Sequence, residues 1–160
     1  MSLNFSIVIP TYHGDILLTR LLNDISNIIL PINLTELIVV ENGEKLKAEC
    51  ICNQYKYLLP IKYIYTQKPG LSNARNIGIK NTEADIIIFF DNDMKFNKDT
   101  LIAYEKVFNH YGENYFYGGS LLADYEVPPP SWLLEYLPWS AKGHSLGDEV
   151  KEINEALFLG

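Results

Sequence analysis

The chain has 160 residues, of which 48% are hydrophobic and 21% are charged. This length and composition are typical of a globular protein with a core of its own, and they exclude a disordered chain. Lysine and arginine number 13 and aspartate and glutamate number 20, which gives a net charge of −7 at pH 7. That balance argues against a nucleic-acid partner, because such binding depends on cations placed against phosphates.

We expect neither a membrane span nor a secretion signal in this sequence. No apolar run approaches the ~18 residues of a membrane span, and the first residues lack a signal-peptide pattern. Cys50 and Cys52 are two positions apart, a spacing that does not bring two side chains together on a helix. We expect them to be free thiols in a reducing compartment, and we expect the protein to be cytoplasmic.

The first two-thirds of the chain alternate between short apolar runs and apolar residues at helical spacing. The apolar runs predict strands at residues 5–9, 37–40, 61–65 and 86–90. Helices are predicted at about 16–28, 44–57, 72–80 and 99–110, and a further strand at 115–122. Near-continuous apolar strands that alternate with helices predict an α/β fold, Rossmann-like and doubly wound around a mainly parallel sheet.

Polar residues and turn formers follow each predicted strand. They occupy positions 10–12, 41–43, 67–70 and 91–93. Because ligands of parallel sheets bind at the carboxyl ends of the strands, we expect the functional site at this edge.

Asp91 and Asp93 are the strongest local signal. They follow the most apolar strand, and on an extended backbone their side chains point the same way, about 6.6 Å apart. One carboxylate can hold Mg²⁺ or Mn²⁺, completed by diphosphate oxygens, while the other reaches a hydroxyl. The alternative is a solvated acidic turn, and the position after a central strand favours function.

Two weaker features point to the same edge. The helix predicted from Ser72 offers free amides to an anion, with Arg75 in its first turns, although ordinary capping by Ser72 explains the pattern equally well. Glu41 and Asn42 have oxygens that can accept hydrogen bonds from a pyrimidine or a ribose. An Asx-type turn is the alternative at that position.

The last part of the chain has a different character. Three prolines at 128–130 precede both tryptophans, Trp132 and Trp139, which we expect to cover a core edge or to line an acceptor groove or partner surface. The chain stops just after the apolar residues 156–159, which suggest the start of a strand. We therefore expect the sequence to be truncated.

Four segments together resemble the nucleotide-binding half of family-2 glycosyltransferases with the GT-A fold. They are SIVIPTYHG, LIVVENG, QKPGLSNARNIGIKNTEADIIIFFDND and YGGS, in the order and spacing of that family. The resemblance covers about residues 6–122. It implies a nucleotide-sugar-binding part at 1–122 and the start of an acceptor-side region at 123–160.

The resemblance assigns five residues to the nucleobase. Pro10, Thr11 and Tyr12 match the segment that packs against the base. Asn42 matches the acidic position that usually bonds the base, and Glu41 matches the acid before it. Glu41 and Asn42 replace the pair of aspartates that is usual in the family, so the identity of the base is left open. Uracil is the first expectation.

The resemblance assigns three further residues to the ribose, phosphates and metal. Arg75 matches an arginine near the base and phosphates. Asp91 matches the first acid of the DxD motif, near the ribose, and Asp93 the acid that binds the metal. His13 stands where the family has asparagine, and we expect it to be a loop residue without a catalytic role.

The resemblance also implies a reaction. A sugar is transferred from a UDP-sugar donor to a hydroxyl of a saccharide or lipid-linked acceptor, with inversion at the sugar. Mn²⁺ or Mg²⁺ is the metal ion that this reaction requires. The family's catalytic base lies in the acceptor half, which we expect beyond Gly160, so this fragment is expected to be inactive alone. Peripheral association of the full protein with the inner face of the cell membrane is a further expectation. The late acids do not match the motif of the base: Asp124, Glu126, Asp148 and Glu149.

Three other functions compete with this one. A sugar-nucleotide nucleotidyltransferase has a similar sheet but needs a basic glycine-rich loop after the first strand, and residues 11–14 contain no lysine or arginine. A non-catalytic nucleotide-binding module remains the alternative from another class. A receiver-like signalling domain needs acids after the first strand, where none occurs.

Overall fold

A computed structural model describes residues 3–112, 114–145, 147 and 149–151. The chain divides into two compact units, Met1–Tyr115 and Phe116–Gly160. The boundary lies before the residue 122 at which the sequence analysis ends the nucleotide-binding part.

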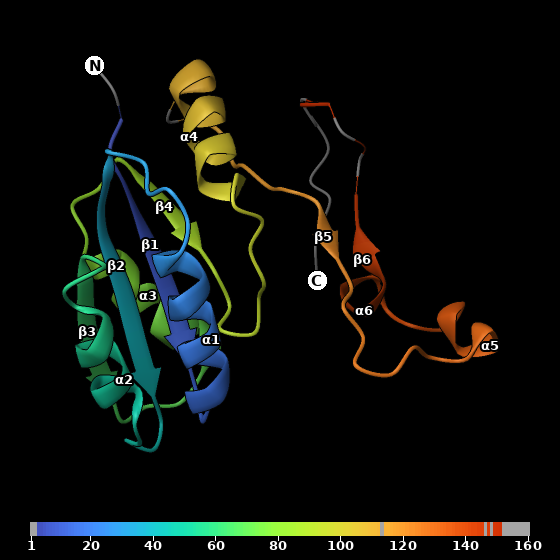
Figure 1. Cartoon of the computed structure of the whole chain (residues 1–160), viewed down its shortest axis with the longest axis horizontal. Coiled ribbons are helices and arrows are strands. Elements are labelled where there is room, and N and C mark those ends of the chain that lie inside the picture. Colours follow the sequence, from blue (N-terminus) through green and yellow to red (C-terminus); the bar gives the residue numbers. More distant parts are fainter. Residues whose placement is uncertain (1–2, 113, 146, 148, 152–160) are drawn as a thin grey trace. The chain divides into compact units, whose positions relative to one another are not determined.

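The first unit is built on a four-stranded parallel sheet. Its strands are β1 (Phe5–Thr11), β2 (Leu34–Asn42), β3 (Ile61–Thr66) and β4 (Ile86–Phe89), in the spatial order β3-β2-β1-β4 (Figure 1). Every neighbouring pair is parallel. The predicted α/β class with a mainly parallel sheet is confirmed.

Helices connect the strands and cover both faces of the sheet. They are α1 (Asp15–Ser26), α2 (Ala48–Tyr55), α3 (Leu71–Lys80) and α4 (Thr100–Tyr111). α1 and α2 contact each other on one face, whereas α3 packs on β1 and β2 from the other side (Figure 1). α3 comes so close to β1 that a Cβ on Gly78 would lie 2.3 Å from Cγ1 of Val8, which is why this helix has glycine there.

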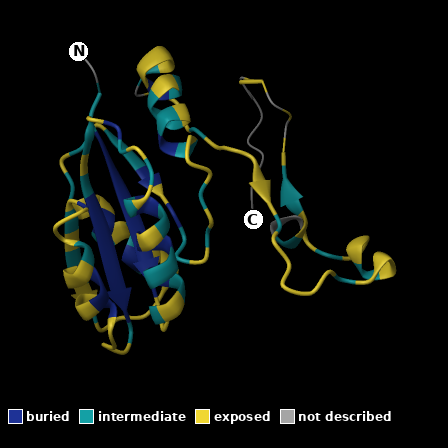
Figure 2. Cartoon of the chain, in the orientation of Figure 1, coloured by how far each residue is buried: buried dark blue, intermediate teal, exposed yellow. Residues whose placement is uncertain are grey.

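The core of the first unit lies between the sheet and its helices. All seven residues of β1 are buried, as the dark strand in Figure 2 shows. Helix α1 adds four fully buried side chains: Leu18, Leu21, Leu22 and Ile25. α4 adds Phe108, whose ring meets the Phe5 ring edge-on with centroids 5.3 Å apart. Apolar burial of this extent is the main stabilising contribution to the unit.

The second unit has little regular structure. It contains a two-stranded antiparallel ladder of β5 (Leu121–Leu122) and β6 (Gly143–His144) and the short helices α5 (Ser131–Leu134) and α6 (Trp139–Lys142). The strand predicted at 115–122 is therefore wrong except at its last two residues. Glycines at 118 and 119 interrupt the apolar pattern, and their lack of side chains weakens a strand. The strand expected near 156–159 lies outside the described residues.

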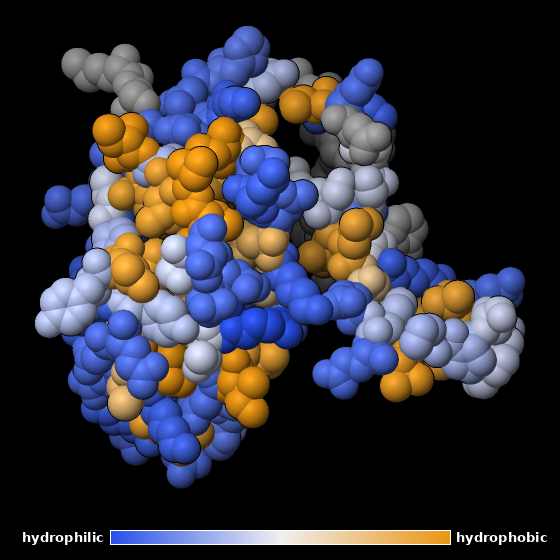
Figure 3. All heavy atoms as spheres, in the orientation of Figure 1, coloured by the Kyte–Doolittle hydropathy of each residue, from blue (hydrophilic) through white to orange (hydrophobic). Residues whose placement is uncertain are grey.

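Hydrophobic side chains reach the surface of both units (Figure 3). No described residue of the second unit is buried (Figure 2). Among the described residues, no helix has the length and apolar character to cross a membrane.

Candidate functional site

A hydrogen-bond network ties together the four segments at the carboxyl edge of the sheet. The side-chain amide of Asn42 donates from Nδ2 to the Thr11 carbonyl at 2.9 Å, and its Oδ1 accepts from the Gly70 amide at 2.9 Å. The Thr11 hydroxyl accepts from Nδ2 of Asn92 at 2.9 Å. Segments far apart in the sequence thus form one continuous edge, the place where the sequence analysis expects the site.

Glu41 and Asn42 belong to strand β2 and not to a turn. β2 continues through Asn42, and both residues are only 3% exposed, so the Asx-turn alternative is wrong. The Glu41 carboxylate accepts hydrogen bonds from the Tyr63 hydroxyl and from the Leu46 amide. Burial and the bond to Glu41 raise the pKa of Tyr63. In this structure Glu41 therefore holds the loop that leads into α2.

Tyr12 provides an exposed aromatic surface at the edge. Its ring lies over Gly43, where an added Cβ would be only 2.7 Å from Cε2 of Tyr12 and 3.5 Å from Cβ of Pro69. Tyr12 is 58% exposed, whereas Pro10 and Thr11 are buried in β1. Of the three residues predicted to pack against a base, only Tyr12 presents its side chain to solvent.

His13 follows Tyr12 in a left-handed backbone conformation with φ of 51°. Its ring lies against the Tyr12 ring with centroids 4.2 Å apart. Nε2 of His13 is 3.7 Å from a carboxylate oxygen of Glu44. The expectation that His13 is a loop residue agrees with this position between β1 and α1.

A side chain of α3 binds the acidic segment that follows β4, residues 91–93. Arg75 donates from Nη2 to Oδ1 of Asp91 at 2.9 Å, and its guanidinium lies 5.8 Å from the centre of the Phe89 ring. Both side chains of the ion pair are partly exposed, so solvent screens the attraction. Asp93 is exposed, and no described residue hydrogen-bonds to its carboxylate.

Asp91 and Asp93 fit a hard divalent cation that is completed by its ligand. The described part of the chain contains no group of three or more His, Cys, Asp or Glu side chains arranged around a metal. Mg²⁺ and similar ions are commonly held by one or two carboxylates together with substrate phosphates and water. Two carboxylates at an open edge match that pattern, although they follow the end of β4 in a turn and not on the extended backbone that the sequence predicts.

The amino end of α3 is open toward the same edge. Gly70 precedes the helix with φ of 129°, a conformation that favours glycine, and no side chain caps the helix. Capping by Ser72 is therefore wrong, because the helix already begins at Leu71. The first amides of α3 remain available to an anion.

Two residues at this edge were missed by the sequence analysis. Asn92 was passed over between the two aspartates, although it joins β1 through Thr11. Arg20 of α1 donates from Nη2 to the backbone carbonyl of Asp93 at 2.6 Å. No local pattern indicates this contact, because the partners are 73 positions apart in the chain.

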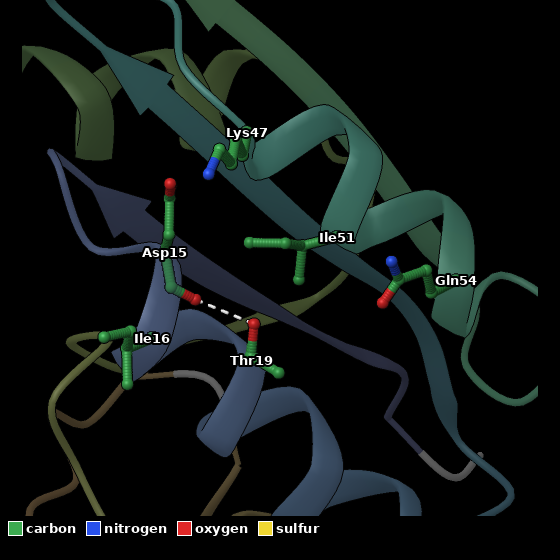
Figure 4. A pocket seen from close by; sticks show the side chains of 6 residues that line it. All are labelled: Asp15, Ile16, Thr19, Lys47, Ile51 and Gln54. Carbon is green, nitrogen blue, oxygen red and sulfur yellow. Dashed lines mark hydrogen bonds between the residues drawn. The ribbon is translucent and has the colours of Figure 1, made fainter.

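A separate groove of about 340 Å³ lies between α1 and α2. Figure 4 shows the six side chains that line it: Asp15, Ile16, Thr19, Lys47, Ile51 and Gln54. The Thr19 hydroxyl donates to the Asp15 carbonyl, and Lys47 points toward Asp15 (Figure 4). None of the predicted site residues lines this groove, so the convergence of polar groups selects the sheet edge as the candidate site.

The sequence matches the family model "Glycosyl transferase family 2" over residues 6–159. The chain is 32% identical over 113 residues to the minor teichoic acid biosynthesis protein GgaB of Bacillus subtilis, which covers 69% of this chain and 12% of GgaB. It is 30% identical over 101 residues to the poly(ribitol-phosphate) beta-N-acetylglucosaminyltransferase TarS of Staphylococcus aureus, which covers 62% of this chain and 18% of TarS. The chain thus spans only a small part of these relatives.

Solved structures show the same fold. The crystal structure of S. aureus TarS 1–349 in complex with UDP-GlcNAc has a TM-score of 0.62 and 24% identity, covering 82% of this chain and 38% of that one. The mannosyltransferase PcManGT from Pyrobaculum calidifontis in complex with GDP-Man and Mn²⁺ has a TM-score of 0.58 and 16% identity, covering 79% and 36%. The fold is that of GT-A glycosyltransferases, and the chain belongs to glycosyl transferase family 2.

Proposed function

We propose that this chain is the donor-binding part of an inverting glycosyltransferase that uses a UDP-sugar and Mn²⁺ or Mg²⁺. The observation that carries the proposal is the convergence at one sheet edge of an exposed aromatic ring, an uncapped helix start and two carboxylates. These are Tyr12, the amino end of α3, and Asp91 with Asp93.

The nucleobase is placed on Tyr12. The exposed ring over Gly43 offers a flat surface for stacking, with Pro69 beside it. Asn42 is only 3% exposed and its Oδ1 accepts a hydrogen bond from the Gly70 amide, so a base N–H would reach the second lone pair of this oxygen only after the surrounding groups open. The TarS complexes with UDP and UDP-GlcNAc support uracil as the first base to test.

The diphosphate is placed between α3 and the acidic segment. The open amides of α3 and the Arg75 guanidinium supply positive partial and full charge for it. Asp93 would hold the metal with Asp91 beside it, and the bound ion would neutralise charge on the departing diphosphate. The two named complexes, TarS with UDP-GlcNAc and PcManGT with Mn²⁺, support this choice of donor and ion.

The acceptor is proposed to be a hydroxyl of a polyol-phosphate polymer. The support is the name of TarS as a poly(ribitol-phosphate) transferase and of GgaB as a minor teichoic acid protein. We place the catalytic base in the acceptor-binding half of the whole protein, where it would deprotonate the hydroxyl. UDP-GlcNAc is accordingly the first donor to test.

Calorimetric titration with UDP, GDP and ADP, each with and without Mn²⁺, tests the proposal. We expect Mn²⁺ to tighten binding of UDP by at least about tenfold in the unaltered chain and not in Asp93→Ala, since that change removes the exposed carboxylate. Glu83→Ala, which removes an exposed carboxylate outside the site, is the matched control. Undiminished Mn²⁺ enhancement in Asp93→Ala would contradict the metal assignment, and equal affinity for the three nucleotides would contradict uracil recognition.

A further inference from the structure

The sequence contains only two arginines, Arg20 and Arg75, and both end on the same three-residue segment. Arg75 reaches the Asp91 side chain from α3, whereas Arg20 reaches the Asp93 backbone carbonyl from α1. These helices lie on opposite faces of the sheet (Figure 1). We infer that Arg20 is a positioning residue that fixes the backbone of residues 91–93, so that the Asp93 carboxylate is presented to the metal and diphosphate.

Backbone hydrogen bonds to the sheet end one residue before the segment 91–93 begins. β4 ends at Phe89, and the last backbone bond to the sheet runs from the Phe90 amide to the Val8 carbonyl. Beyond that point the described contacts are a turn that the Met94 amide closes on the Asp91 carbonyl, at 3.2 Å, and bonds from side chains. Side chains therefore determine where Asp93 lies.

Helix α1 approaches the segment at two places. A Cβ on Gly14, just before α1, would lie 1.9 Å from Nδ2 of Asn92, so the backbone comes very close there. Two turns along the helix, Arg20 makes its bond to Asp93 at 2.6 Å. A bond from a charged donor to a carbonyl is stronger than a neutral one, and the planar guanidinium holds its direction.

The geometry of Arg20 distinguishes it from a surface cation. Its Nε is buried and has no hydrogen-bond partner among the described residues, as is also true of Nε of Arg75. The Nε end of the Arg20 side chain is thus packed against the protein, although the residue as a whole is partly exposed. Losing this bond should leave the sheet intact and loosen the segment that holds the acids.

The role of Arg20 toward the metal rests on the proposed function, whereas its role in holding residues 91–93 can be tested without a ligand. Amide hydrogen exchange is measured in the nucleotide-free chain for Arg20→Met, Arg20→Lys and the control Lys106→Met, which alters an exposed cation of α4. We expect the exchange rate of Met94, relative to that of the β1 amides, to rise about tenfold in Arg20→Met and less in Arg20→Lys, which keeps a charged donor. An unchanged ratio in Arg20→Met would overturn the inference, whether or not the chain binds nucleotides.

The second test measures UDP affinity with and without Mn²⁺ in the same variants. We expect Arg20→Met to weaken Mn²⁺-supported binding about tenfold and metal-free binding less than about twofold, because the base is proposed to stack on Tyr12 and the Asp91 side chain is still held by Arg75. An equal loss with and without Mn²⁺ would overturn the role toward the metal. If the unaltered chain shows no Mn²⁺ enhancement, the proposed function fails, while the exchange ratio still decides whether Arg20 holds the segment.

Discussion

The two units of the chain differ in how many of their described side chains are buried. In Met1–Tyr115, β1 is buried along its whole length and helices cover both faces of the sheet. In Phe116–Gly160, no residue whose exposure the structure describes is buried, and Trp132 is 67% and Val127 82% exposed. Apolar burial stabilises a fold roughly in proportion to the area removed from water, so the two units cannot contribute equally to stability.

The comparison separates two ways of holding a segment in place. The first unit places its polar edge on a rigid sheet, and the bonds of Asn42 and Asn92 then fix the positions of neighbouring segments. The second unit has a two-residue ladder and short helices, with the Tyr125 hydroxyl bonded to the Ala141 carbonyl. The proposed donor site needs fixed geometry, and we place it in the unit in which the described residues form a core.

The largest expected difference between the units concerns aromatic side chains. Phe108→Ala removes a fully buried ring that packs on Phe5, and we expect it to lower the free energy of unfolding by about 3–5 kcal/mol. Trp132→Ala removes a side chain that is 67% exposed and should cost less than about 0.5 kcal/mol. Urea unfolding followed by circular dichroism measures both values. Comparable losses would show that the second unit is packed more tightly than the structure indicates.

A smaller difference is expected for polar side chains. Asn42→Leu leaves the buried Thr11 carbonyl without its bond to Nδ2 and the Gly70 amide without Oδ1, so we expect a loss of about 1–3 kcal/mol. Ser145→Ala removes an exposed contact with the Ser120 hydroxyl and should change stability by less than about 0.5 kcal/mol. Both variants are compared in the same unfolding experiment. A neutral Asn42→Leu would mean that the edge network does not depend on this amide.

At pH values close to 9.0, the smallest effect concerns the two cysteines of α2, which are free as expected, one exposed and one buried. Burial raises the pKa of Cys52 from 9.0 to about 12, so the folded chain keeps a proton that the unfolded chain loses. The stability from this group is therefore complete below pH 9.0 and declines as the pH rises toward 12. Unfolding at a series of alkaline pH values should show a shallower decline in Cys52→Ala than in the unaltered chain. In parallel, a thiol reagent should modify native Cys50 and spare Cys52, and rapid modification of both would contradict the burial of Cys52.

The strands of the sheet could be predicted from the sequence because each is indicated by neighbouring residues alone. The apolar runs that contain Val8, Ile38 and Ile88 are each long enough to indicate a buried strand without knowledge of the rest of the chain. The alternation with helices then indicated parallel strands, and the position of the polar residues indicated the functional edge. The same local logic failed at 115–122, where aromatic side chains suggested a strand that is paired only at Leu121–Leu122.

The contacts within the site could not be predicted, because they join segments that are distant in the sequence. Glu41 and Asn42 suggested a turn from their composition, whereas their burial depends on β1 and β3 lying on either side of them. Asn42 bonds a residue 31 positions earlier, and Arg20 a residue 73 positions later. Residue types indicated which chemistry is available at the edge, and only the fold shows which side chains are already engaged by the protein.

The division at Tyr115 also determines what an optical experiment on this chain can observe. Both tryptophans, Trp132 and Trp139, belong to the second unit, whereas the donor edge carries tyrosines such as Tyr12 and Tyr65. Emission excited selectively in tryptophan therefore monitors the second unit, and far-ultraviolet circular dichroism is dominated by the helices of the first. A label-free fluorescence reporter of nucleotide binding has to be introduced into the first unit, with an exposed ring position near the carboxyl end of a strand, such as Tyr65 of β3, as a starting point.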